Sequence, residues 1–182
     1  MNVLVFCSAQ DIPEKYTKAA SEFASLVARN GHTLVWGGSD RGTMKTIADA
    51  AQAEGGKIVG ISMELLKHNV RRNTDELYIG KDLAERKRLM LERSDAIVVL
   101  AGGIGTLDEA TEVLALKRHR YHNKPVVFLD TGGFYYGMRT QLARMEEEGF
   151  LKNMDKDTEE ETLFYFAETP EEVMRYIEGN GN

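Results

Sequence analysis

Short apolar runs alternate with longer amphipathic segments along most of this 182-residue chain. The short runs have the length and composition of buried strands, and the longer segments place apolar residues on one face of a helix. The predicted strands cover residues 2–7, 32–36, 57–61, 75–79, 95–100, 125–129 and 162–167. The predicted helices cover residues 13–29, 42–54, 82–93, 106–120, 133–148 and a last segment that starts at Pro170 with Thr169 as its cap.

Strands that alternate with helices favour an α/β fold with a parallel sheet covered on both faces. We therefore expect a doubly wound, mostly parallel, Rossmann-like sheet, with residues 1–182 forming one nucleotide-binding domain. The polar segment at residues 152–161 is expected to be a surface loop. In such sheets ligands bind beyond the carboxyl ends of the strands, where the strand order reverses.

A glycine-rich turn follows the apolar run Ile97–Leu100. Gly102, Gly103 and Gly105 permit backbone angles closed to other residues and let a ligand approach the main chain closely. The helix predicted to follow offers unpaired N–H groups and the positive end of its dipole, which together favour a phosphate. The turn therefore predicts a phosphate-binding site.

Glu109 lies one turn inside that helix, and two roles are open to it. The run from Thr106 to Glu109 matches a capping box, in which Thr106 caps the helix and Glu109 bonds back to the N–H of the cap. Alternatively, a carboxylate beside a phosphate anchor can act on a bound nucleotide. These roles conflict, because a carboxylate turned toward the cap cannot equally face a substrate.

A second glycine turn, with Gly37, Gly38 and Gly42, again lies between a predicted strand and a predicted helix. This turn could complete a nucleotide cradle. It fits neither the GxGxxG dinucleotide fingerprint nor the GxxxxGK[ST] P-loop, so those two binding modes lose support.

A run of four charged residues, 85–88, lies in the helix before the strand at residues 95–100. Such a run is usually a solvated face. Arg86, however, lies one strand–helix unit upstream of the first glycine turn, and its planar donor fork suits phosphate or carboxylate groups. We therefore treat Arg86 as a candidate for the site.

Composition narrows the function classes. With 29 acidic and 23 basic residues the formal net charge is −6, the opposite of the balance usual in nucleic-acid-binding proteins. The single cysteine, Cys7, is expected to be a buried structural thiol, and the four histidines show no metal-ligand spacing, so no metal site is expected. No targeting segment and no apolar run near the roughly 20 residues of a membrane span is present, which favours a cytoplasmic protein.

Taken together, these motifs resemble the LOG (Lonely Guy) family, long described as lysine-decarboxylase-like. The family's PGGxGTxxE turn corresponds to residues 101–109, and its E-R-K helix motif corresponds to residues 85–87. The glycine turn after the second strand and the start of the strand at residues 123–126 are similar too. The resemblance extends from Val3 to about Leu151.

The resemblance implies a phosphoribohydrolase that cleaves N6-modified adenosine 5′-monophosphates into free base and ribose 5-phosphate. Arg86 and Glu109 would be the catalytic pair. The resemblance implies no metal or organic cofactor, and a homodimer or larger homo-oligomer with sites near the subunit contacts. The substrate-binding residues that it implies are Gly37, Gly38, Gly42, Lys87, Gly102, Gly103, Gly105 and Thr106.

These residue types suit the chemistry. Breaking an N-glycosidic bond builds positive charge on the sugar. A carboxylate such as Glu109 can stabilise that charge and orient or deprotonate the attacking water. Arg86 would hold the substrate or keep Glu109 ionised. Asp108 is a candidate for the acid that protonates the departing base, although a carboxylate in the first helical turn also simply suits the helix dipole.

Several positions depart from the family pattern. Ala101 replaces the proline of the turn, Ser39 and Lys45 stand where glycines are usual, and Leu116 and Arg118 stand where tryptophan and glutamine are frequent. These departures leave the N6 substituent open and keep plain AMP as a possible substrate.

Two other functions compete with hydrolysis. Molybdenum-cofactor carrier proteins resemble this family, so a non-enzymatic nucleotide or molybdenum-cofactor carrier is the alternative, and tight binding without turnover would favour it. A true lysine decarboxylase is disfavoured, because no lysine lies in a recognisable pyridoxal-phosphate motif.

Overall fold

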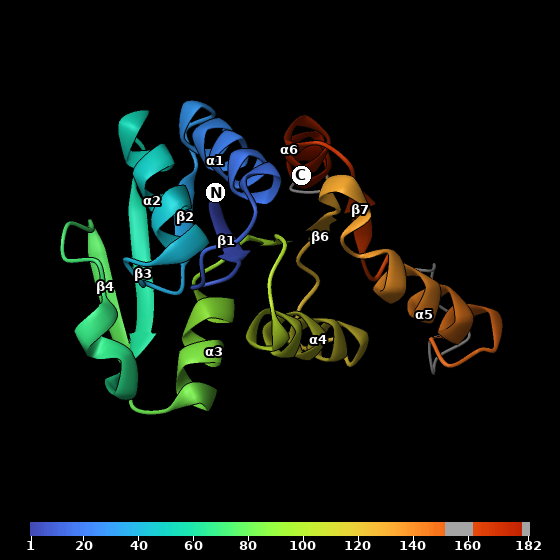
Figure 1. Cartoon of the computed structure of the whole chain (residues 1–182). Coiled ribbons are helices and arrows are strands. Elements are labelled where there is room, and N and C mark those ends of the chain that lie inside the picture. The colour runs from blue at the N-terminus through green and yellow to red at the C-terminus, as the bar shows by residue number, and fades with distance from the viewer. Residues whose placement is uncertain (152–161, 180–182) are drawn as a thin grey trace.

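A parallel sheet of seven strands forms the centre of the protein (Figure 1). The computed structural model describes residues 1–151 and 162–179. The strand order is β4-β3-β2-β1-β5-β6-β7, and all neighbouring strands are parallel. The strands are β1 (Asn2–Phe6), β2 (Thr33–Trp36), β3 (Ile58–Met63), β4 (Glu76–Gly80), β5 (Ala96–Val99), β6 (Val126–Leu129) and β7 (Tyr165–Ala167).

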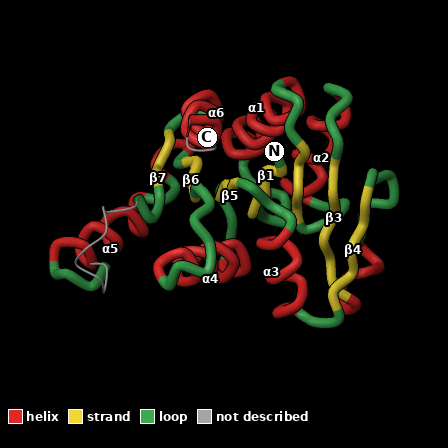
Figure 2. The backbone as a smooth tube through the Cα atoms, turned by 180° about the vertical axis from the view of Figure 1, so that it is seen from behind, coloured by secondary structure: helices red, strands yellow, loops and turns green. Residues whose placement is uncertain are grey.

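Helices cover both faces of the sheet (Figures 1 and 2). One face packs against α1 (Glu14–Arg29), α2 (Gly42–Ala53) and α6 (Pro170–Gly179). The other face packs against α3 (Leu83–Glu92) and α4 (Ile104–Arg118). Helix α5 (Tyr136–Glu147) extends outward beside β6 and β7 in both views.

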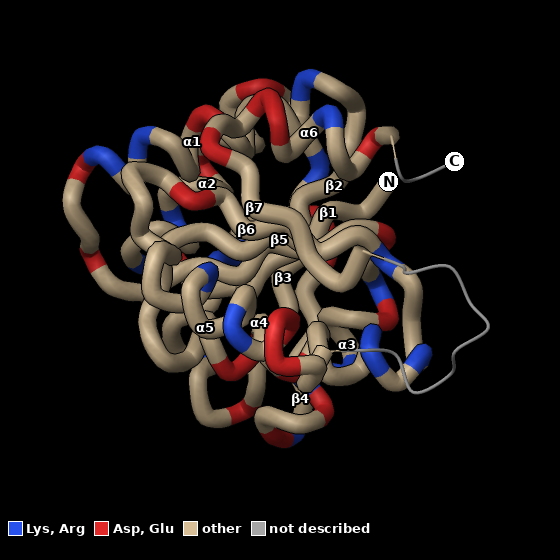
Figure 3. The backbone as a smooth tube through the Cα atoms, turned by 90° about the vertical axis from the view of Figure 1, so that its right-hand side faces the viewer, with Lys and Arg blue, Asp and Glu red and all other residues tan. Residues whose placement is uncertain are grey.

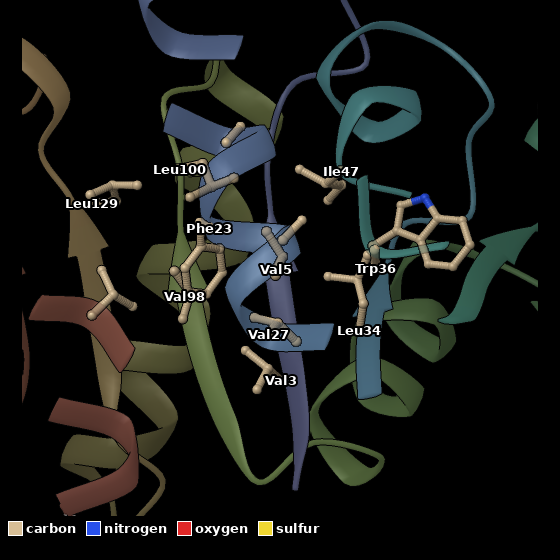
Figure 4. Packing of buried hydrophobic residues seen from close by; sticks show 14 of the residues in the cluster. Val3, Val5, Phe23, Val27, Leu34, Trp36, Ile47, Val98, Leu100 and Leu129 are labelled. Carbon is tan, nitrogen blue, oxygen red and sulfur yellow. The ribbon is translucent and has the colours of Figure 1, made fainter. Parts of the chain in front are cut away.

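The core lies on both faces because successive strand residues point in opposite directions. Val3 and Val5 of β1 pack with Phe23 of α1 in one apolar cluster (Figure 4). Leu4 and Phe6 of the same strand belong to the other cluster, with residues of α3 and α4. A strand buried on both faces needs a continuous apolar run, which is the pattern that predicted it.

The strand order reverses at β1, which has β2 on one side and β5 on the other. From β1 the chain builds outward to β4, returns through α3, and builds outward again from β5 to β7. In sheets of this kind ligands bind beyond the carboxyl ends of the strands at such a reversal. The predicted Rossmann-like α/β fold is confirmed, and the glycine turn after β5 lies at the carboxyl end of that strand.

Each predicted strand and helix is present, and most differences lie at the ends. The predicted strand at residues 162–167 is shorter than expected and forms one edge of the sheet as β7. At α6, Thr169 is the expected cap, because its hydroxyl accepts the Glu172 N–H at 3.3 Å. The predicted loop at residues 152–161 lies outside the described residues.

Two short 3₁₀ helices were not predicted: η1 (Glu64–Asn69) after β3 and η2 (Thr131–Gly133) after β6. The helix expected from residue 133 begins at Tyr136 instead. Gly132 and Gly133 adopt positive φ angles of 60° and 73°, which an α-helix does not accept.

Acidic and basic residues are interspersed along the backbone (Figure 3). Within residues 1–151 and 162–179, no helix is both long enough and apolar enough to cross a membrane.

Candidate active site

Arg86 is placed by the first turn of α3. Asp82 caps this helix by accepting the Glu85 N–H at 2.8 Å, which fixes where the helix begins. The Arg86 side chain then points into the protein and is only 5% exposed as a residue. Its Nε donates to the carbonyl oxygen of Ile61 in β3 at 3.1 Å, and its Nη1 donates to Oε1 of Glu109 at 2.7 Å.

Glu109 therefore pairs with Arg86, and of the two roles left open for it the capping box is excluded. Helix α4 begins at Ile104, two residues earlier than expected, with Gly103 as its cap residue. Thr106 is then inside the helix, and the carboxylate of Glu109 turns toward α3 instead of the helix start. Gly103 has no side chain that could cap the helix, so no capping pattern in the sequence marks the true start of α4.

Burial dominates the electrostatics of this pair. Both side chains are 7% exposed, so both charges lie largely out of water. Burial raises the pKa of Glu109 above its ordinary value, and the neighbouring Arg86 charge opposes that rise without cancelling it. A buried carboxyl with a raised pKa and a fixed charged partner is typical of a functional site.

The glycine turn after β2 makes room for this pair. A Cβ atom on Gly37 would lie 2.5 Å from Nη2 of Arg86, so only glycine lets the guanidinium lie there. Gly38 and Gly42 have φ angles of 72° and 52°. A Cβ atom on Gly42 would also lie 2.4 Å from the carbonyl oxygen of Gln10. The loop after β1, which contains Gln10, and the glycine turn after β2 therefore lie very close together.

The glycine turn after β5 has two kinds of glycine. A Cβ atom on Gly102 would lie 2.2 Å from Oγ1 of Thr106, so Gly102 is required by packing against the buried Thr106. Gly103 and Gly105 face open space, since a Cβ atom on either would meet no atom within 4 Å. The first N–H groups of α4 have no acceptor within the helix and are available to an anion here.

The paired residues each line a cavity. Arg86 lines one of about 580 Å³ together with Gly37 and Gly42, and Glu109 lines another of about 340 Å³. The other residues around the first cavity are Ala9, Gln10, Asp11, Ser39, Arg41, Met44, Ser62, Leu66 and Asn69. Residues 102–106 line neither of these two cavities.

Lys87, the residue after Arg86, is held by two carboxylates of α4. Its ammonium pairs with Asp108 at 3.1 Å and with Glu112. Although burial lowers the pKa of Lys87, its bonds to Glu112 and Asp108 raise it, and the net direction is upward. The sequence drew attention to Lys87 and Asp108 but not to Glu112, which lies one turn beyond Asp108 on the same face of α4.

Tyr135 is a second residue that the sequence did not single out. It is 3% exposed, and its hydroxyl donates to the carbonyl oxygen of Leu100 at 2.7 Å, just before the glycine turn. Its backbone N–H donates to Asp130 at 2.7 Å. Burial raises the pKa of Tyr135, which keeps the hydroxyl protonated as a donor. No local pattern separates such a tyrosine from an ordinary core aromatic.

Cys7 lies directly after β1 and is buried, as expected for a structural thiol. Burial raises the pKa of this thiol, and the charge of Glu109 raises it further. Across the described ranges, no group of three or more His, Cys, Asp or Glu side chains could hold a metal ion.

The parallel sheet, the reversal of strand order at β1 and the buried Arg86–Glu109 pair define a Rossmann-like protein with a candidate active site. The profile of a family described as possible lysine decarboxylase matches residues 44–177. The chain is 36% identical over 151 residues to a cytokinin riboside 5′-monophosphate phosphoribohydrolase of Mycobacterium tuberculosis, covering 82% of this chain and 81% of that protein. A protein of the same name from Arabidopsis thaliana is 31% identical, over 97% of this chain and 76% of its own length. The chain belongs to the LOG family.

Solved structures support the same fold. A molybdenum-cofactor-binding protein from Rippkaea orientalis matches with a TM-score of 0.70 and 22% identity, covering 100% of this chain and 96% of that one. A molybdenum-cofactor carrier protein from Chlamydomonas reinhardtii matches with a TM-score of 0.70 and 21% identity, covering 98% and 95% of the two chains. At these identities the likeness shows a shared fold.

Proposed function

We propose that this protein hydrolyses the N-glycosidic bond of N6-modified adenosine 5′-monophosphates, releasing the free base and ribose 5-phosphate. The observation that carries the proposal is the buried pair of Arg86 and Glu109 at the switch point of the sheet. Family membership and the names of the relatives in Mycobacterium tuberculosis and Arabidopsis thaliana support it.

In this proposal Glu109 is the catalytic carboxylate. Arg86 binds only its Oε1 atom, which leaves Oε2 for the substrate or the attacking water. Near C1′ of the ribose, the carboxylate would stabilise the positive charge that develops as the bond to the base breaks, and it would orient the water. The second hydrogen bond of Arg86, to the carbonyl oxygen of Ile61, fixes the guanidinium, and the guanidinium in turn holds the carboxylate in place.

The start of α4 would bind the 5′-phosphate. Gly103 and Gly105 leave open space beside the first N–H groups of this helix, and Gly102 and Thr106 hold the turn in shape. On the other side of the pair, Gly37 and Gly42 line the cavity of about 580 Å³ and would contact the nucleotide, with Gly38 shaping that loop. No metal or organic cofactor takes part in the proposed reaction.

The test is chromatographic detection of free base and ribose 5-phosphate from AMP and from N6-isopentenyl-AMP. Wild type is compared with Glu109→Gln, which keeps an oxygen for Arg86 but cannot act as a base. Glu148→Gln is the matched control, because Glu148 is an exposed partner of Arg144 at the end of α5. Nucleotide binding is measured in parallel by calorimetry.

We expect wild type and Glu148→Gln to release base and sugar phosphate in equal amounts. Glu109→Gln should release them at least about 100-fold more slowly while still binding nucleotide, which is the usual effect of losing a general base. Normal hydrolysis by Glu109→Gln would show that Glu109 has no catalytic role. Tight binding of either nucleotide by wild type without release would favour the carrier function instead.

We further propose a cytoplasmic homodimer or larger homo-oligomer. Two apolar side chains at the ends of α4 support a subunit contact, because Ile104 is 82% exposed and Tyr121, just after the helix, is 78% exposed. The buried free thiol of Cys7 is compatible with a reducing compartment. Light scattering on the purified protein tests the assembly, and fractionation of the source cells tests the location.

A further inference from the structure

We infer that Lys87 is a positioning residue, which clamps α4 against α3 so that Glu109 stays opposite Arg86. The inference rests on the proposed function for its kinetic consequences. It differs from the sequence-based prediction, in which Lys87 binds the substrate.

The contacts form two parallel connections between the same helices. Arg86 and Lys87 are consecutive on α3, and Glu109 and Asp108 are consecutive on α4, so each cation reaches the carboxylate opposite it. Glu112 adds a second acceptor for Lys87. The Lys87 side chain is 15% exposed, whereas those of Asp108 and Glu112 are 48% and 38% exposed, so the ammonium lies beneath its two partners.

The two helices need such a clamp because they rest on different strands. Helix α3 packs on β3 and β4, whereas α4 packs on β1, and the two lie side by side on one face of the sheet (Figures 1 and 2). The cavity of about 340 Å³ separates them, with Leu91 of α3 on one side and Val113 and Leu116 of α4 on the other. Both helices contribute side chains to the same apolar cluster, but this packing leaves the cavity between them, and the ion pairs bridge the two helices beside it.

If Lys87 bound the substrate instead, its ion pairs would have a different effect on activity. To reach a phosphate, the ammonium would have to leave both Asp108 and Glu112. Neutralising these carboxylates would then free Lys87 for the substrate and preserve or improve binding. If Lys87 acts through the carboxylates, the same change breaks the clamp and lowers turnover.

The kinetic test compares Lys87→Met, Asp108→Asn/Glu112→Gln and the three changes combined. We expect kcat to fall about tenfold or more in each, since a small misplacement of a reacting group can cost up to about 100-fold. KM should change little, and the triple variant should be no slower than Lys87→Met. Lys87→Arg should recover most of the activity. Lys67→Met, which removes a similarly paired but 66% exposed lysine of η1, is the control.

A second measurement does not depend on hydrolysis. Spin labels on Ala84→Cys and Ala115→Cys, exposed positions of α3 and α4, report the distance between the helices. We expect the distribution to broaden or shift in Lys87→Met and in Asp108→Asn/Glu112→Gln, but not in Lys67→Met. This expectation stands even if wild type hydrolyses neither nucleotide, so a failure of the proposed function is recognised separately.

Two results would overturn the inference. A raised KM with unchanged kcat in Lys87→Met, together with normal kinetics in Asp108→Asn/Glu112→Gln, would assign Lys87 to the substrate. Unchanged spin-label distances in both variants would show that the ion pairs do not hold the helices, whatever the activity.

Discussion

Arg86 and Glu109 are 23 residues apart in the chain, yet Nη1 of one lies 2.7 Å from Oε1 of the other, and both side chains are almost fully buried. Each charge is the main compensation for the other. Removing one partner leaves an unpaired charge out of water, whereas replacing both with apolar residues removes the problem.

This relationship predicts a non-additive pattern of stability. Arg86→Met should lower the free energy of unfolding by about 3–5 kcal/mol, because Glu109 is left buried and unpaired. Arg86→Met/Glu109→Leu should be more stable than that single variant. Denaturant unfolding of the three proteins measures both values. A double variant less stable than Arg86→Met would show that the pair is not coupled through burial.

The raised pKa of Glu109 predicts a pH-dependent difference between wild type and Glu109→Gln. Between the ordinary pKa of 4.5 and the raised native value, the native state holds a proton that the unfolded state has lost. The free energy of unfolding contributed by Glu109 is therefore fully present below about pH 4.5 and falls as pH rises through the native pKa.

Unfolding of both proteins at a series of pH values measures this difference, since all other carboxyl groups contribute equally to each. Wild type should lose stability relative to Glu109→Gln as pH rises. A difference that changes in the opposite direction would mean that the Arg86 charge outweighs burial and lowers the pKa of Glu109.

Gly37 should be intolerant of any side chain. In Gly37→Ala the new methyl would lie 2.5 Å from Nη2 of Arg86, so the guanidinium would have to shift from the position in which it binds Glu109. We expect a loss of about 1–3 kcal/mol of stability from overpacking, together with a loss of hydrolysis. Gly137→Ala, in α5 with no atom near its new methyl, is the control. Thermal unfolding and base release measure both effects, and full activity in Gly37→Ala would refute the arrangement.

The fold was predictable because it depends on local pattern. Apolar runs such as that of β1 specify buried parallel strands, and glycines between strands and helices mark the turns at one edge of the sheet. The partner of Glu109 was not predictable in this way. The local match from Thr106 to Glu109 favours a capping box as readily as a site. What decides between them is a side chain from α3, whose approach depends on tertiary packing.

Other parts of the site could not be predicted from the sequence. The acceptor for Nε of Arg86 is a backbone carbonyl, that of Ile61, which any residue would provide. Glu112 is one of many acidic residues, and its importance depends on the distance between α3 and α4.

A substitution at Gly105 tests the approach of the ligand without disturbing the packing of the protein. In Gly105→Ala the new methyl meets no protein atom within 4 Å, and alanine is the better helix former by about 0.5–1 kcal/mol. We therefore expect unchanged or higher stability but a raised KM, because the methyl occupies the space proposed for the phosphate. Gly137→Ala should give the stability change without the change in KM. Equal KM values in both variants would mean that the phosphate does not bind at the start of α4.

Tyr135 should support the glycine turn through a single hydrogen bond. Tyr135→Phe removes the donor to the Leu100 carbonyl and leaves that oxygen without its partner, at a cost of about 1–3 kcal/mol. Tyr136→Phe is the matched control, since Tyr136 is 74% exposed and the same change there should alter stability by less than about 0.5 kcal/mol. Because Leu100 directly precedes the turn, Tyr135→Phe should also weaken nucleotide binding, which calorimetry measures. Loss of stability with unchanged binding would show that the α4 end of the turn holds its shape without this bond.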